Sequence, residues 1–147
     1  MIPTQHKSDS PFRLVVTGQA TDWAPALSRL IGPRYVELHR VDSNRDLMDV
    51  VQSHQADAAV VDDQVDWAND GLKLLRMIRR VDVDLPVLIV TRHHDRQFLQ
   101  SALQLHAYSV VSGPLGFEQL LRQIYGMMQR MEQVLGDELN ERNPFDF

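Results

Sequence analysis

The chain has 147 residues, of which 44% are hydrophobic and 24% charged, and this composition fits one globular domain that buries its own core. Its formal net charge of −5 argues against a nucleic-acid partner, and the absence of cysteine excludes disulfides, thiolate metal sites and cysteine nucleophiles. No apolar run approaches the roughly 20 residues that span a bilayer, and the polar N-terminus is unlike a secretory signal. We therefore expect a cytoplasmic protein without a membrane contact.

Strand-like and helix-like segments alternate along the chain between a polar leader at 1–11 and an acidic, polar tail at 136–147. β-branched and apolar runs predict strands at 12–18, 35–41, 57–62, 84–91 and 108–112. Apolar residues at helical spacing predict helices at 21–32, 42–56, 69–80, 95–107 and 116–135. This alternation is typical of a doubly wound α/β fold with a parallel sheet, and it places one domain at 12–135.

Two residues carry signals for helix ends. Gly32 is expected to end the first helix, because glycine readily adopts the conformation that follows a helix C-terminus. Asp70 precedes the third helix, where a negative charge is favourable.

Ligands of doubly wound sheets bind beyond the carboxyl ends of the strands. Polar and turn-forming residues follow the predicted strands at these ends: Thr17 and Gly18, Asp62 and Asp63, Thr91 and Arg92, and Ser112, Gly113 and Pro114. The sequence thus predicts carboxylate and hydroxyl groups around one crevice.

At these positions the chain resembles the receiver domain of two-component response regulators. The matching segments, in order, are "DAAVVD", "DGL" with "LLRMIR", "DLPVLIVT", and "GP" followed by "FEQLL", within about residues 12–128. The resemblance implies a flavodoxin-like (βα)5 three-layer sandwich with a five-stranded sheet in the order 2-1-3-4-5. It also implies a non-enzymatic phosphorelay module that accepts a phosphoryl group from a histidine kinase.

In that family an aspartate ending the third strand accepts the phosphoryl group, and two acidic residues after the first strand help to hold Mg²⁺. A hydroxyl residue after the fourth strand and a lysine before a proline after the fifth contact the phosphoryl group. The phosphoacceptor position corresponds to Asp62 by its distance from Asp57, or to Asp63 by its distance from Asp70 and Gly71; we favour Asp62. Thr91 corresponds to the hydroxyl residue.

The chain departs from the family pattern at three positions. Thr17 and Gly18 stand in place of the acidic pair, and Gly113 stands in place of the lysine. Mg²⁺ binding should therefore be weak at best, and we expect no other cofactor. The alternative is a rebuilt metal site formed by Asp62, Asp63 and Asp66, against the simpler interpretation of a solvated acidic loop.

The last helix carries an apolar pattern about two turns longer than the receiver pattern requires. The residues of the main apolar stripe are three or four positions apart, and Met128 belongs to a second stripe beside it. The main stripe consists of Leu120, Ile124, Met127, Met131 and Val134. This stripe indicates either a dimer or partner interface or a helix that folds back on its own domain.

We therefore expect an atypical receiver domain that acts mainly as a phosphorylation-independent interaction module, binding a histidine kinase, an output protein or a second copy of itself. Too few residues remain beyond this domain for an output domain, so output through another protein is expected. One alternative is a phosphoacceptor modified at Asp62 with a rearranged Mg²⁺ site. The other is a small-molecule binder, although "TGQATDW" lacks the spacing of a glycine-rich phosphate loop.

Overall fold

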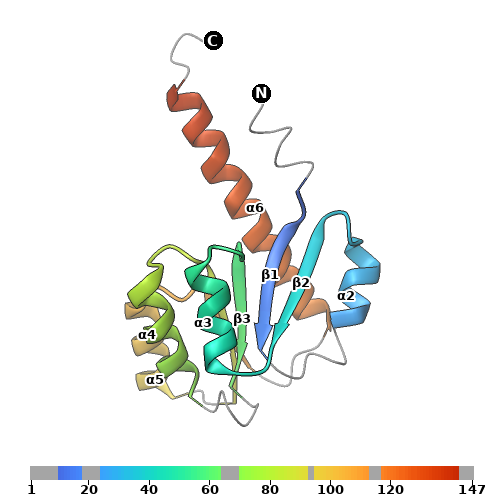
Figure 1. Cartoon of the computed structure of the whole chain (residues 1–147). Helices are drawn as coiled ribbons and strands as arrows, with labels where there is room; N and C mark the ends of the chain where they lie inside the picture. The colour runs from blue at the N-terminus through green and yellow to red at the C-terminus, as the bar shows by residue number, and fades with distance from the viewer. Residues whose placement is uncertain (1–9, 18–23, 64–69, 93–94, 113–116, 143–147) are drawn as a thin grey trace.

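The computed structural model describes residues 10–17, 24–63, 70–92, 95–112 and 117–142. Its strands form one parallel sheet in the order β2-β1-β3-β4-β5 (Figure 1), which confirms the predicted fold and strand order. The strands are β1 (Phe12–Thr17), β2 (Val36–Val41), β3 (Ala58–Asp62), β4 (Val87–Thr91) and β5 (Ser109–Ser112). The helices are α2 (Ala24–Ile31), α3 (Asn44–Gln52), α4 (Gly71–Val81), α5 (Arg96–Gln104) and α6 (Phe117–Arg142). The leader at 1–9 lies outside the described residues.

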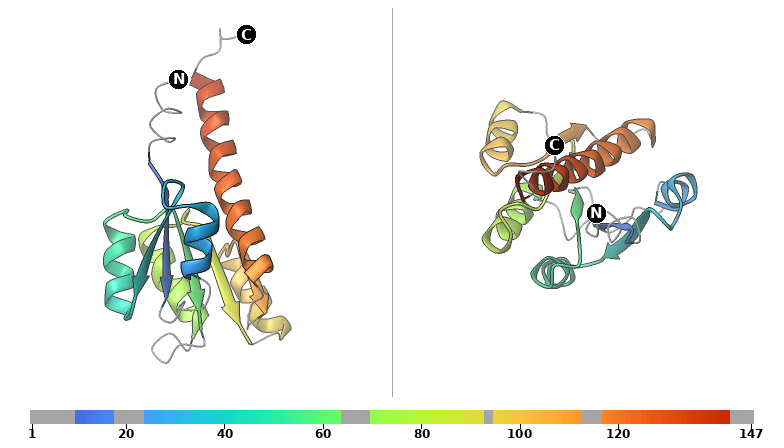
Figure 2. Two further views of the ribbon diagram at one scale, coloured as in Figure 1. Left: turned by 90° about the vertical axis from the view of Figure 1, so that its right-hand side faces the viewer. Right: turned by 90° about the horizontal axis from the view of Figure 1, so that it is seen from above.

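The sheet is covered by helices on both faces, which explains why the inner strands β3 and β4 are almost continuously apolar. Side chains alternate between the faces: Ala58 and Val60 of β3 join the core under α2 and α6, whereas Ala59 and Val61 join the core under α3, α4 and α5. Figure 2 shows the two helical layers on either side of the sheet. Among the described helices, none combines the length and hydrophobicity needed to cross a bilayer.

Two helices end earlier than their sequence patterns predict. Gly32 has φ 96° directly after α2, as expected, but His54 and His106 also adopt positive φ angles, 55° and 58°. Both histidines lie two residues beyond the ends of α3 and α5, in the left-handed conformation that glycine most often adopts there. The predicted helices at 42–56 and 95–107 were therefore too long, because histidine carries no strong sequence signal for a helix end.

Helix α6 differs from the prediction in its length and in the burial of its apolar stripe. It continues through Gly136 to Arg142, so much of the expected polar tail is helical. Leu120, Ile124 and Met127 are at most 1% exposed and fill the core beside the sheet, so their assignment to an interface is wrong. The helical spacing of these residues reflects packing inside the domain, because the N-terminal half of α6 lies directly on the sheet.

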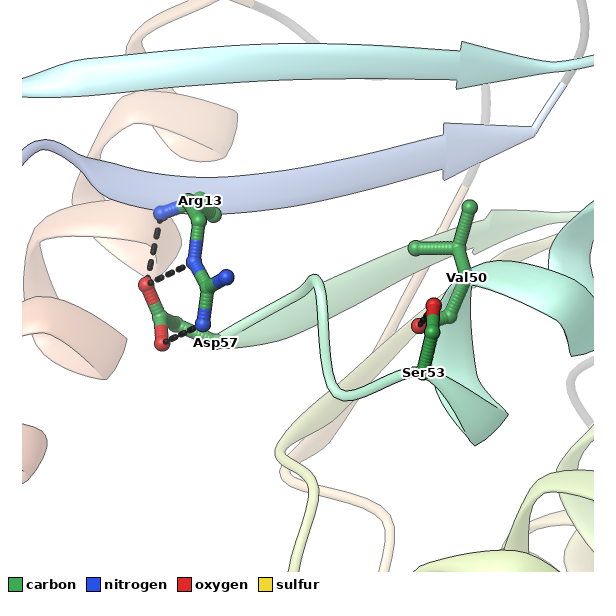
Figure 3. Close-up of polar contacts among 4 residues, drawn as sticks. All are labelled: Arg13, Val50, Ser53 and Asp57. Atoms are coloured by element: carbon green, nitrogen blue, oxygen red, sulfur yellow. Dashed lines mark hydrogen bonds and ion pairs between the residues drawn. The ribbon is translucent and has the colours of Figure 1, made fainter.

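The starts of β1 and β3 are joined by an ion pair (Figure 3). The Asp57 carboxylate accepts hydrogen bonds from the Arg13 backbone N–H at 2.8 Å and from Arg13 Nη2 at 3.3 Å. The backbone N–H of Asp57 in turn donates to the Arg13 carbonyl at 2.7 Å. These contacts fix the pairing of β1 with β3 at the N-terminal ends of the two strands.

Tyr108 precedes β5 and packs closely against α6. A Cβ added at Gly126 would collide with the Tyr108 hydroxyl, whereas the nearest ring carbon, Cζ, would remain 3.6 Å away. The guanidinium of Arg130 lies over the Tyr108 ring at 6.0 Å from its centroid. Glycine at this position therefore allows α6 to approach the sheet.

Substitution of Gly126 by alanine should consequently destabilise the domain by roughly 1–3 kcal/mol, although alanine is normally favoured in helices. In a Tyr108→Phe background the obstructing hydroxyl is gone, and the same substitution should stabilise the domain by up to about 1 kcal/mol. Urea unfolding of the four proteins measures both effects. Equal effects in the two backgrounds would show that the hydroxyl is not the obstacle.

Arg79 links the C-terminal ends of α4 and α5. Its Nε and Nη2 donate to the carbonyls of Leu105 and His106 at 2.8 and 3.0 Å, and its Nη1 donates to the Asp82 carbonyl at 3.1 Å. Burial lowers the pKa of the guanidinium, while nearby Asp82 and Asp84 oppose this change. An arginine nevertheless remains charged near neutral pH, so the cation stabilises carbonyls that the helices leave without intrahelical donors.

Replacement of Arg79 by methionine should cost roughly 2 kcal/mol of unfolding free energy, since several charge-assisted hydrogen bonds are lost. The neighbouring Arg80 is exposed and provides the matched control, for which Arg80→Met should change stability by less than about 0.5 kcal/mol. Chemical denaturation measures the free energy of unfolding of both variants. Equal values would show that Arg79 does not specifically link α4 and α5.

Candidate functional site

Three polar side chains meet at the carboxyl ends of β1, β3 and β4. Thr17, Asp63 and Thr91 are 2%, 7% and 0% exposed. Each lies two residues after a side chain of the core under α3, α4 and α5. These preceding core residues are Val15 for Thr17, Val61 for Asp63 and Ile89 for Thr91. The alternation of side chains along strands therefore places all three polar groups on that same side of the sheet.

The pairing of β3 with β4 selects Asp63 as the partner of Thr91. Asp62 is paired with Val90, and the backbone N–H of Asp63 donates to the Val90 carbonyl at 3.1 Å. The next residues, Asp63 and Thr91, consequently lie level on one face, and Thr91 Oγ1 donates to Asp63 Oδ2 at 2.5 Å. The sequence left Asp62 and Asp63 open as the acceptor position and favoured Asp62; of the two, Asp63 is the one that lies on the face of Thr91 and accepts from its hydroxyl.

Thr17 contacts the backbone of β3. Its Oγ1 accepts a hydrogen bond from the Asp62 N–H at 2.9 Å and donates to the Asp62 carbonyl at 3.3 Å. A neutral hydroxyl thus occupies the place for which the family resemblance implies a carboxylate. Its contacts stabilise the β1–β3 junction and add no negative charge.

The N-terminus of α4 packs against Asp63. A Cβ added at Gly71 would lie 3.5 Å from Asp63 Cβ and 3.3 Å from Ile89 Cγ2, so glycine permits the close approach. Asp70 caps the same helix, since its Oδ1 accepts from the Lys73 N–H at 3.1 Å. Asp70 is therefore a helix cap, as its sequence position indicated, and the positive end of α4 faces the buried Asp63 carboxylate.

The described carboxylates at these strand ends are those of Asp62 and Asp63, which are oxygen ligands of the kind that Mg²⁺ takes. Thr91 engages the Asp63 carboxylate and the Asp62 backbone engages Thr17, whereas Mg²⁺ needs well-placed carboxylate, phosphate or water oxygens. Within the described ranges, no group of three His, Cys, Asp or Glu residues is arranged to hold a metal. Gly18, Asp66 and Gly113 lie outside those ranges, so the rebuilt metal site remains a sequence prediction.

A shallow cavity of about 250 Å³ lies at the other end of the sheet, lined by Arg13, Glu37, His39 and Gln55. It opens near the starts of β1 and β2. It is therefore separate from the strand ends at which doubly wound folds bind nucleotides. Its position gives no support to nucleotide binding beside Asp63.

The chain belongs to the response regulator receiver domain family, whose model matches residues 20–125. It is 30% identical over 105 residues to the virulence transcriptional regulatory protein PhoP of Salmonella typhimurium, covering 69% of this chain and 46% of that protein. It is 24% identical over 120 residues to the response regulator MprA of Mycolicibacterium vanbaalenii, covering 82% of this chain and 52% of that protein. The chain thus spans about half the length of these relatives.

A solved receiver domain shares the fold. The CheY-like receiver domain protein from Methanospirillum hungatei superposes with a TM-score of 0.69 at 14% identity, covering 84% of this chain and 98% of that one. Together with the family match, this likeness makes the chain a receiver domain of two-component signalling. Such domains interact with histidine kinases and output domains.

The Thr91–Asp63 contact should contribute measurably to stability. Thr91→Val removes the donor to a buried carboxylate and should cost roughly 2 kcal/mol. In an Asp63→Ala background that acceptor is absent, so the same substitution should cost at least about 1 kcal/mol less. Thr91→Ser, which keeps the hydroxyl, is the control for lost packing. Additive effects of the Thr91 and Asp63 substitutions in urea unfolding would contradict this coupling.

Proposed function

We propose that this receiver domain acts mainly as a phosphorylation-independent protein-interaction module in cytoplasmic two-component signalling. The observation that carries the proposal is Thr17, whose hydroxyl is hydrogen-bonded to the Asp62 backbone at the position of the absent acidic pair. The partner is a signalling protein, either a histidine kinase or an output protein.

The electrostatics of phosphoryl transfer support this proposal. An aspartyl phosphate concentrates negative charge, which a metal ion and a cationic side chain must neutralise. Thr17 supplies no ligand charge, and the sequence has Gly113 where the family has its lysine. Since the parts of such a site act together, the loss of several should remove nearly all of the phosphorylation rate.

Exposed apolar side chains offer surface for a protein partner. Leu99 and Leu103 of α5 are 38% and 67% exposed, and Tyr125 of α6 is 44% exposed. Both helices flank β5, the edge strand of the sheet. This side of the domain therefore has contact surface whose availability does not require phosphorylation.

A phosphoacceptor function is the second candidate, and one contact favours it. The buried Asp63 carboxylate lies within hydrogen-bonding distance of Thr91, the residue that corresponds to the phosphoryl-contacting hydroxyl. If this function is retained, the acceptor is Asp63 rather than Asp62, and Asp62 or Asp66 must assist Mg²⁺ binding.

Incubation with Mg²⁺ and acetyl phosphate, followed by intact-mass analysis, separates the two candidates. We expect no phosphoryl adduct on the wild-type chain under conditions that modify a phosphorylatable receiver domain treated in parallel. An unchanged Trp67 fluorescence during a Mg²⁺ titration would agree with that result.

Two matched variants identify the acceptor if an adduct does form. An adduct that persists in Asp62→Asn but disappears in Asp63→Asn would refute the interaction-only proposal and establish Asp63 as the phosphoacceptor. Loss in Asp62→Asn alone would refute the proposal and restore the original sequence assignment.

A further inference from the structure

Helix α4 is strongly basic, although the chain as a whole carries a net charge of −5. Its 11 residues include one lysine and three arginines and no acidic side chain. The guanidinium of Arg79 is engaged by the carbonyls that follow α5. The other three cations, Lys73, Arg76 and Arg80, are exposed. Their charge therefore faces the surroundings of the domain.

The three exposed cations form a basic stripe along α4. They are three and four residues apart, which places them on one side of an α-helix. Leu75 and Ile78 on the opposite side have no exposed area and pack on the sheet. Helix α4 contacts both α3 and α5 and is the middle helix of its layer (Figure 2). The basic stripe consequently lies on the outer side of this helical layer.

The described part of the domain does not neutralise the basic stripe. Among the described residues, no carboxylate lies within ion-pairing distance of its three cations. Like charges three and four residues apart on a helix repel each other and destabilise it. A negatively charged ligand along the stripe would remove this repulsion.

Lys73 occupies a position that is unfavourable for a cation. It is the third residue of α4, after the N-cap Asp70, and its backbone N–H donates to Asp70 Oδ1 at 3.1 Å. The helix dipole repels a cation in the first turn, and a glutamate at this position would complete a capping box. Arg80 lies in the last turn, where a cation is favourable. Helix stability thus accounts for Arg80 but not for Lys73, whereas an anionic partner accounts for both.

Apolar side chains border the basic stripe. Leu72 and Met77 are partly buried against the core under α4, and at about 100° per residue they fall on either side of the cations. The cations themselves span about 10 Å along the helix axis. A matching ligand therefore combines several negative charges at this spacing with apolar groups beside them.

A protein segment fits this combination better than a nucleic acid or a membrane. Nucleic acids and anionic membranes present extended negative charge, which the net charge of −5 on the rest of the chain would repel. A short segment with carboxylates and apolar side chains contacts only α4 and its borders. Charge complementarity therefore favours an acidic amphipathic segment.

We propose that the basic stripe of α4 is a docking surface for an acidic amphipathic segment of a partner protein. Carboxylates of the segment pair with Lys73, Arg76 and Arg80, and its apolar side chains contact Leu72 and Met77. This inference rests on the proposed function, because it specifies the chemistry of a partner of the interaction module. It adds a contact surface on α4 to the exposed apolar side chains of α5 and α6.

Fluorescence anisotropy of the full chain with a synthetic probe, without Mg²⁺ or a phosphoryl donor, tests this surface. The probe is a fluorescein-labelled helical peptide with glutamates along one side and leucines beside them. We expect saturable binding that weakens as the salt concentration rises. Combined Lys73→Gln, Arg76→Gln and Arg80→Gln should lower the affinity at least about tenfold.

A second triple variant is the matched control. Arg29→Gln, Arg34→Gln and Arg40→Gln change the net charge equally at exposed positions of α2, of β2 and of the turn between them. Since distant charges are screened, this variant should bind the glutamate peptide within about twofold of the wild type. Equal losses in the two triple variants, or equal binding of a peptide with glutamine in place of glutamate, would overturn the proposal. Tighter binding of a DNA duplex than of the peptide would overturn the choice of a protein partner.

A single charge reversal separates binding from folding. Lys73→Glu places a carboxylate at the third position of α4, so it should raise the urea midpoint of the free domain while lowering its affinity for the glutamate peptide. A midpoint that does not rise, or an affinity that does not fall, would overturn the inference. Absence of peptide binding would overturn this inference alone, whereas an acetyl phosphate adduct would refute the proposed function and leave the peptide affinities intact.

Discussion

The parallel sheet is buried on both faces, and this burial decides where polar side chains of the central strands can lie. The edge strand β2 carries exposed polar side chains at Glu37, His39 and Arg40. The inner strands β3 and β4 instead supply apolar side chains in both directions, so their polar groups are confined to the strand ends. This confinement brings Thr17, Asp63 and Thr91 together at one edge. It also leaves the Arg13–Asp57 pair at the opposite edge, where it holds the starts of two central strands.

The polar cluster at the carboxyl ends combines one buried carboxylate with two buried hydroxyl groups. Thr91 and Asp63 keep a close hydroxyl–carboxylate contact, and the N-terminus of α4 packs against the same carboxylate. Thr17 Oγ1 accepts a hydrogen bond from the Asp62 backbone N–H and donates one to the Asp62 carbonyl. These contacts join β1, β3 and β4 at their carboxyl ends.

Helix α6 combines two roles in one continuous sequence pattern. Its first half completes the core with Leu120, Ile124 and Met127, and its second half extends beyond the sheet toward Arg142. Burial along the helix is already partial at Met131.

The alternation of strands and helices and the two-sided core could be predicted from local periodicity, and Gly32 and Asp70 indicated the C-terminus of α2 and the N-terminus of α4. Only the tertiary structure decided that Asp63 faces Thr91, because a step of one residue reverses the direction of a strand side chain. It likewise decided that Leu120, Ile124 and Met127 are internal, since helical spacing alone does not identify which surface covers an apolar stripe.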